Sequence, residues 1–308
     1  MRRLVSGNQE HRPRGKRLRS LAFLPTLITL GNLVCGFAAI HFAMRELYHA
    51  APLGPVMFEK MLPSYLSLGA LLILAGMFLD AFDGLIARVT RSTTTFGGQL
   101  DSLADVITFG AAPATLMVAF MTRELAGDSI VPSPISEHTL GRLTWIAAAI
   151  YTSFTAMRLA RFNVEHAQAE HDHRVFRGLP SPGAASILVA IIFFQDQEIF
   201  PVARSFIVYT TPAITTAIAL LMVSRVPYMR FYRLLGRQPF HQVLILLMVV
   251  ALFLAWPALM LLVLTTTYGL SGPIQHGLRW IRERQFPASG TGQAPAPQIR
   301  HSDKGHAI

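Results

Sequence analysis

The most regular feature of the sequence is a series of long apolar segments separated by short polar stretches. A helix needs about 20 mostly apolar residues to cross the hydrocarbon of a bilayer. Eight segments approach this length, although the fifth, seventh and eighth are short. They cover residues 21–43, 62–86, 101–122, 140–160, 182–195, 206–223, 241–256 and 258–273. The pattern predicts an all-α fold: a polytopic membrane helical bundle of about eight transmembrane helices.

The number of spans depends on Pro257, which alone separates the last two segments. A proline can end one helix before a tight hairpin, or kink a single longer helix. Basic residues concentrate in the cytoplasmic loops of membrane proteins. With the N-terminus in the cytoplasm, eight spans place 22 of the 27 basic residues inside, whereas seven spans place only 17 there. The charge distribution therefore favours eight spans.

The composition excludes several other classes of protein. Apolar residues make up 52% of the chain and charged residues 14%, whereas an ordinary soluble domain carries roughly 25% charged residues. The single cysteine, Cys35, excludes a disulfide framework and a thiolate metal cluster. The net charge of +10 lies mostly in the predicted inner loops, so we expect no nucleic-acid partner.

The two ends differ from the apolar body. Residues 1–20 form a basic arm, which we expect in the cytoplasm. Residues 21–273 form the transmembrane domain. Residues 274–308 form a cytoplasmic tail, and its composition from about residue 286 onward, rich in Pro, Gly, Ala and Ser, predicts disorder.

Four aspartates stand out, because ionisable groups at membrane depth are costly and often functional. Asp80 and Asp83 lie near the end of the second predicted span, and Asp101 and Asp105 at the start of the third. The i, i+3 and i, i+4 spacings place each pair on one helical face. Because the two spans are antiparallel and joined by a turn at about 89–99, all four carboxylates are predicted to converge near the cytoplasmic interface.

Carboxylate oxygens in this number suit hard divalent cations, namely Mg²⁺, Mn²⁺ or Ca²⁺. Four aspartates can hold two such ions, and a two-metal site suits displacement at phosphorus. Small residues beside them leave room for a bulky ligand, and Arg88 is a cation suited to phosphate. These small residues are Gly84, Ala87, Gly97 and Gly98.

Residues 80–105 match the pattern D-x2-D-G-x2-A-R-x8-G-x3-D-x3-D at every fixed position. This pattern resembles the signature of the CDP-alcohol phosphotransferase family. Residues 24–37, 101–114, 157–164, 176–185 and 223–231 resemble the integral-membrane phosphatidylserine synthases of bacteria, a branch of that family. The signature is often preceded by Pro-Asn in the first span, whereas this chain has Pro25-Thr26.

The resemblance implies an enzyme that transfers the phosphatidyl group of CDP-diacylglycerol to the hydroxyl of L-serine, giving phosphatidylserine and CMP by metal-assisted displacement. It implies that Asp80, Asp83, Asp101 and Asp105 bind metal and that Asp105 is the catalytic base. It also implies a homodimer in the bacterial inner (cytoplasmic) membrane, with the active site facing the cytoplasm. The implied nucleotide diphosphate site consists of Gly84, Ala87, Arg88 and Gly97.

Further polar residues are candidates for the substrates. Thr29 and Asn32, spaced i, i+3, are expected either to contact cytidine or to form hydrogen bonds between helices. Arg161 and Arg158 are expected to bind the serine carboxylate or to anchor their helix at the interface. Asn163 and Ser181 complete the proposed serine site.

Two alternatives stay open at this point. The first is the same chemistry with another acceptor alcohol: glycerol 3-phosphate, inositol phosphate or choline. The second is a cation transporter, which would place acidic residues deep in the bilayer beside paired broken helices. The position of the aspartates near one interface favours the enzyme.

Overall fold

The computed structural model describes residues 23–48, 62–90, 95–168, 178–197, 204–226, 228, 248, 252–253 and 255–285. Within these ranges the regular structure is entirely helical. The elements are α1 (Phe23–Tyr48), α2 (Tyr65–Thr90), α3 (Thr95–Asp105), the π-helix η2 (Val106–Ala111), α4 (Ala112–Glu124), the 3₁₀ turn η3 (Ala126–Asp128), α5 (Thr139–Gln168), α6 (Ser181–Asp196), α7 (Arg204–Val223) and α9 (Pro257–Gln285).

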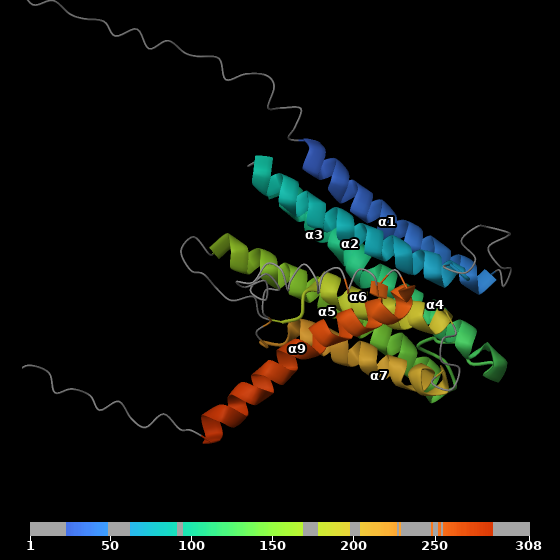
Figure 1. Cartoon of the computed structure of the whole chain (residues 1–308). Helices are drawn as coiled ribbons and strands as arrows, with labels where there is room; N and C mark the ends of the chain where they lie inside the picture. Colours follow the sequence, from blue (N-terminus) through green and yellow to red (C-terminus); the bar gives the residue numbers. More distant parts are fainter. Residues whose placement is uncertain are drawn as a thin grey trace, which may run out of the picture.

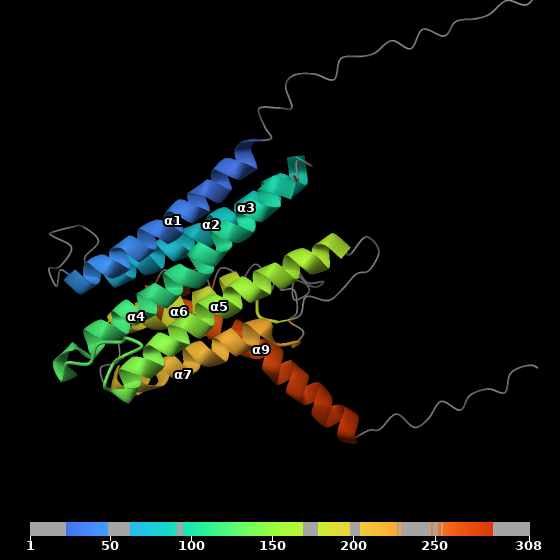
Figure 2. The same cartoon turned by 180° about the vertical axis from the view of Figure 1, so that it is seen from behind.

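The helices form a bundle in which α1 and α2 lie side by side along one edge (Figures 1 and 2). Helix α5 packs against α7, and α6 packs against α9. The π-helix η2 contacts α1, α2, α4, α5 and α6. The segment that carries Asp101 and Asp105 therefore leads directly into the most central element of the described bundle.

Five described helices are long and apolar enough to cross a membrane. They are Pro25–Tyr48, Tyr65–Ile86, Phe96–Glu124, Arg204–Val223 and Pro257–Leu278. Large apolar side chains on their outer faces, such as Val34, Phe37 and Phe78, are exposed in the isolated chain. A bilayer covers such faces, so the exposure agrees with a membrane helical fold.

Seven of the eight predicted spans coincide with described helices, and several of these helices extend beyond the predicted range. The third span begins at Thr95, and the fourth, α5, continues to Gln168. The fifth is the short apolar helix α6. Helix α9 continues to Gln285, past the predicted boundary at 273. The predicted span 241–256 lies mostly outside the described residues, as do the basic arm 1–20 and the tail from 286.

The core of the bundle surrounds η2 and α4. Phe109, Leu116, Met117 and Phe120 are fully buried there, against Tyr151 of α5. A π-helix is rare and usually occurs as a single turn near a functional site. Here the Tyr151 hydroxyl donates to the Phe109 carbonyl at 3.0 Å. This hydrogen bond ties the π-helix to α5 immediately after Asp105.

Candidate functional site

Three of the four predicted aspartates come together where α2 meets α3. One carboxylate oxygen from each of Asp80, Asp101 and Asp105 lies within 4.8 Å of the other two. Asp80 comes from α2, while Asp101 and Asp105 lie one turn apart on α3. Asp105 is buried, and the other two are partly exposed. Three negative groups at this separation repel one another in the absence of a cation.

Asp83 lies next to this carboxylate triad but is directed elsewhere. It interacts electrostatically with Asp80 and Asp101. Its own carboxylate is buried and accepts a hydrogen bond from the Thr29 hydroxyl of α1. The predicted convergence is therefore confirmed in geometry for three carboxylates, with the fourth immediately beside them.

The space beside the motif glycines is open. A Cβ atom added at Gly84 or at Gly98 would meet nothing within 4 Å. Gly97 and Gly98 lie in the first turn of α3, so the expectation that they belong to the preceding turn was wrong. Ala87 and Arg88 belong to the end of α2, and their side chains lie outside the described part of the chain. The backbone of α2 and of α3 is therefore open to the surroundings at these two glycines of the motif.

Thr29 and Asn32 both take part in hydrogen bonds between helices. The Asn32 amide donates from Nδ2 to Asp105 Oδ1 at 3.3 Å, and Thr29 contacts Asp83. Both residues are buried. One of the two expected alternatives, the hydrogen bond between helices, is therefore present for each residue, while a contact with cytidine stays a prediction.

The four residues predicted to bind serine have three different sets of partners. Arg158 donates to the Ser181 hydroxyl at 2.9 Å and interacts electrostatically with Asp105. Arg161 instead pairs with Glu165 at 2.8 Å. Asn163 exchanges hydrogen bonds with Ser102 of α3, beside Asp101. Of the two arginines, Arg158 is the one that faces the carboxylate triad.

The donor set fits a hard divalent cation. Every ligand atom in the triad is a carboxylate oxygen, which suits Mg²⁺, Mn²⁺ or Ca²⁺. Asp105 and Asp83 also have protein donors behind them, as is usual for metal ligands.

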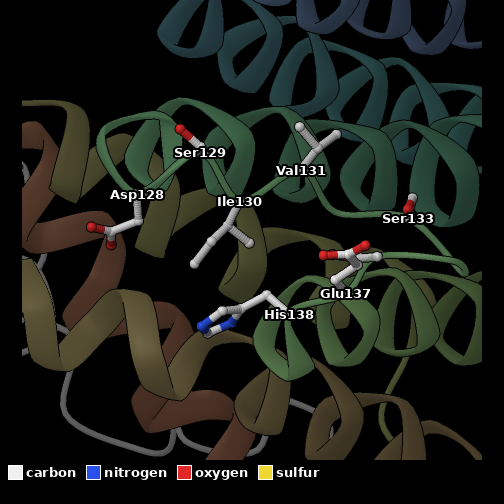
Figure 3. Close-up of a pocket in the computed structure, with 8 residues that line it drawn as sticks. Asp128, Ser129, Ile130, Val131, Ser133, Glu137 and His138 are labelled. Atoms are coloured by element: carbon white, nitrogen blue, oxygen red, sulfur yellow. The ribbon is translucent and has the colours of Figure 1, made fainter.

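A pocket lies in the connection between α4 and α5 (Figure 3). It has a volume of about 490 Å³ and is lined by Asp128, Ser129, Ile130, Val131, Ser133, Ser136, Glu137 and His138. None of these residues belongs to the carboxylate triad. The pocket follows the far end of α4, so it is separate from the site at the start of α3.

Three polar residues around the segment that follows Asp105 were not predicted from the sequence. Thr108 donates to the backbone carbonyl of Asn32 at 3.0 Å, and Tyr151 holds the Phe109 carbonyl. Tyr268 of α9 lies near Arg158, with which it interacts electrostatically. A polar residue inside an apolar span indicates a hydrogen bond between helices, but the sequence does not identify the partner, because the partner depends on the fold.

The fold and this site define a helical membrane protein with an oxygen-ligand cluster between two antiparallel spans. Comparison with known proteins shows to which family of membrane proteins this chain belongs. The chain matches the CDP-alcohol phosphatidyltransferase family over residues 22–272, which is most of its length. The chain belongs to this family.

Individual relatives agree with the family match. The chain is 28% identical over 209 residues to "CDP-diacylglycerol--serine O-phosphatidyltransferase" of Bacillus subtilis (strain 168), covering 68% of this chain and 91% of the relative. It is 26% identical over 278 residues to the protein of that name from Mycobacterium leprae (strain TN), covering 88% and 80%. The corresponding protein of Helicobacter pylori (strain ATCC 700392 / 26695) is 27% identical over 214 residues, covering 70% and 75%.

Proposed function

We propose that the protein transfers the phosphatidyl group of CDP-diacylglycerol to the hydroxyl of L-serine, releasing phosphatidylserine and CMP. The observation that carries this proposal is the carboxylate triad of Asp80, Asp101 and Asp105, within a chain of the CDP-alcohol phosphatidyltransferase family. The names of the relatives support CDP-diacylglycerol and serine as the substrates.

In this proposal the aspartates hold one or two divalent ions, Mg²⁺ or Mn²⁺. The bound ions supply charge stabilisation to the diphosphate and the leaving group. The CDP-lipid enters the open space beside Gly84 and Gly98, where no side chain lies within 4 Å of an added Cβ. Gly97, Ala87 and Arg88 flank the same entrance by their positions on α3 and α2.

Asp105 is proposed to accept the proton of the serine hydroxyl. The serine oxygen forms a bond to the phosphorus that carries diacylglycerol, the P–O bond to CMP breaks, and CMP leaves. Asp105 is suited to this role because it is buried beside Arg158 and receives a hydrogen bond from Asn32. A general base must come within hydrogen-bond reach of the proton that it accepts.

The serine carboxylate is proposed to bind Arg158 and Ser181, which lie 2.9 Å apart beside the triad. The buried Nε of Arg158 has no hydrogen-bond partner among the described residues, so a donor is available to a carboxylate. Asn163 is placed beside Asp101 through Ser102. Arg161, paired with Glu165, is proposed to contribute at the entrance.

We also propose that the protein lies in the bacterial inner membrane with the site facing the cytoplasm. The distribution of basic residues supports this orientation. A homodimer stays a prediction.

The test is CMP release from CDP-diacylglycerol by the purified protein with Mn²⁺ or Mg²⁺ and each acceptor in turn. We expect release with L-serine and none after chelation. Release with glycerol 3-phosphate, inositol phosphate or choline, but not with serine, would refute the serine assignment. The Asp105→Asn variant should lose turnover while still binding the CDP-lipid, and retained turnover would exclude Asp105 as the base.

A further inference from the structure

We infer that α1 positions the metal-binding carboxylates, with Thr29 and Asn32 as the positioning residues. The inference rests on the metal site of the proposed function, but not on the choice of acceptor. It gives α1 a role in the site although α1 carries none of the aspartates.

The first contact joins α1 to Asp83 on α2. The Thr29 hydroxyl lies in contact with Asp83 Oδ2 and 3.0 Å from the Pro25 carbonyl. A hydroxyl has one proton to donate, and an ionised carboxylate is the stronger acceptor. Thr29 therefore donates to Asp83 when that carboxylate is charged, which leaves Asp83 Oδ1 for another partner.

The second contact joins α1 to Asp105 on α3. Asn32 Nδ2 donates to Asp105 Oδ1 at 3.3 Å, and Asn32 is fully buried. The opposite amide orientation would place its carbonyl oxygen against the carboxylate, so the hydrogen bond fixes the assignment of the two amide atoms. One oxygen of Asp105 is thus held by the protein, and Oδ2 is left for a cation or a proton.

The surroundings of Asn32 favour Asp105 as the partner of its amide group. Its Oδ1 has no hydrogen-bond partner among the described residues. A Cβ added at Gly76 of α2 would lie 2.8 Å from this oxygen. The amide is therefore enclosed between α1 and the backbone of α2, and its one described hydrogen bond goes to the carboxylate.

The position of Asn32 is itself fixed by the π-helix. Thr108 donates to the Asn32 carbonyl at 3.0 Å. The Thr108 side chain packs where Gly36 and Gly76 carry no Cβ, and a Cβ at Gly76 would lie 2.7 Å from Thr108 Cγ2. This close packing brings α1, α2 and η2 into direct contact. It fixes the position of the Asn32 amide on α1 relative to the Asp105 carboxylate, which directly precedes η2.

The experiment measures Mn²⁺ binding directly on the purified full-length protein, from the electron paramagnetic resonance signal of free Mn²⁺. Removing a group that orients a metal ligand typically weakens metal binding about 10- to 100-fold. We expect this increase in the dissociation constant for Thr29→Val and for Asn32→Leu. Thr29→Ser keeps the hydroxyl and should bind like the parent.

Thr215→Val is the matched control. It removes the hydroxyl of a fully buried threonine in α7, which donates to the Thr211 carbonyl of the same helix at 2.8 Å, and α7 carries none of the aspartates. We expect its Mn²⁺ affinity to stay near that of the parent, even if its thermal unfolding temperature falls. Thr29→Val is nearly isosteric, so the Thr29→Val and Thr29→Ser pair decides the result if Asn32→Leu fails to fold.

Two results would overturn the inference. One is unchanged Mn²⁺ binding by Thr29→Val and Asn32→Leu, and a raised KM for CDP-diacylglycerol would then assign both residues to the nucleotide. The other is an equal loss of affinity in Thr215→Val, which would make the effect one of general packing. If the parent binds Mn²⁺ but releases no CMP with serine, the proposed function fails while the titration still decides this inference.

Discussion

Arg123 should be the charge whose removal destabilises the described bundle most. Its guanidinium lies 2.7 Å from Asp196, 3.2 Å from Glu46 and 3.4 Å from Glu124. These partners come from α6, α1 and α4, so one side chain joins three helices. The Asp196 carboxylate also accepts hydrogen bonds from Ser64 and Ser67 at the start of α2.

The magnitude follows from burial. The side chains of Asp196 and Glu124 are each 3% exposed, and that of Arg123 is 29% exposed. Removing one partner of a buried ion pair costs roughly 3–5 kcal/mol, because the remaining charge is left without compensation. Since Arg123 is partly exposed, we expect about 3 kcal/mol for Arg123→Met, at the lower end of that range. The shift per kcal/mol becomes smaller as a chain becomes longer, and for 308 residues it is about 1.5 °C per kcal/mol, so the unfolding temperature should fall by roughly 5 °C.

The assay is thermal unfolding of the purified protein in detergent, in which size-exclusion chromatography measures the folded fraction that remains after heating. Arg204→Met is the matched control, because Arg204 also binds Glu124, at 2.6 Å, but its side chain is 50% exposed. An exposed pair is worth about 0–1 kcal/mol, so the control should lower the unfolding temperature by no more than about 1.5 °C. Equal shifts for the two variants would refute the reasoning. Adding Asp196→Asn to Arg123→Met should recover part of the loss, because it removes an unpaired charge.

Three further outcomes are expected. Gly76→Ala should lower the unfolding temperature, since its Cβ would lie 2.7 Å from Thr108 Cγ2 and overpacking costs about 1–3 kcal/mol. Gly84→Ala should leave that temperature unchanged or higher, because its Cβ meets nothing within 4 Å, while CMP release falls if the CDP-lipid uses this space. Tyr151→Phe should cost about 1–3 kcal/mol in the same unfolding assay, because the buried Phe109 carbonyl loses its donor.

Much of the site could be predicted from the sequence because its spacing is local. Asp80 and Asp83 share a helical face at i, i+3, and Asp101 and Asp105 do so at i, i+4, whatever the rest of the fold. Two antiparallel spans joined by a short connection then bring both pairs to one depth. These two facts predict that the carboxylates converge, but they do not predict that Asp83 turns toward Thr29 of α1 and leaves a triad.

The part that could not be predicted depends on contacts between distant segments. The Asn32–Asp105 hydrogen bond joins residues 73 positions apart in the chain. Likewise, the different partners of Arg158 and Arg161 depend on the position of Ser181 on α6, to which Arg158 donates a hydrogen bond. The sequence favoured Arg161 for the serine carboxylate, and only the packing of α5 shows that Arg158 interacts with Asp105 while Arg161 pairs with Glu165.

The π-helix η2 links the local spacing of the aspartates to the packing of the rest of the bundle. A π-turn adds a residue to a helix and changes the direction of the side chains on either side of it. The π-helix η2 begins directly after Asp105 and ends directly before α4. The direction of the Asp101 and Asp105 side chains on α3 is therefore independent of the direction in which α4 buries its apolar side chains. Thr108 ties this turn to α1, and Tyr151 ties it to α5. The carboxylates can therefore face an open polar site while the same continuous helix buries Leu116, Met117 and Phe120.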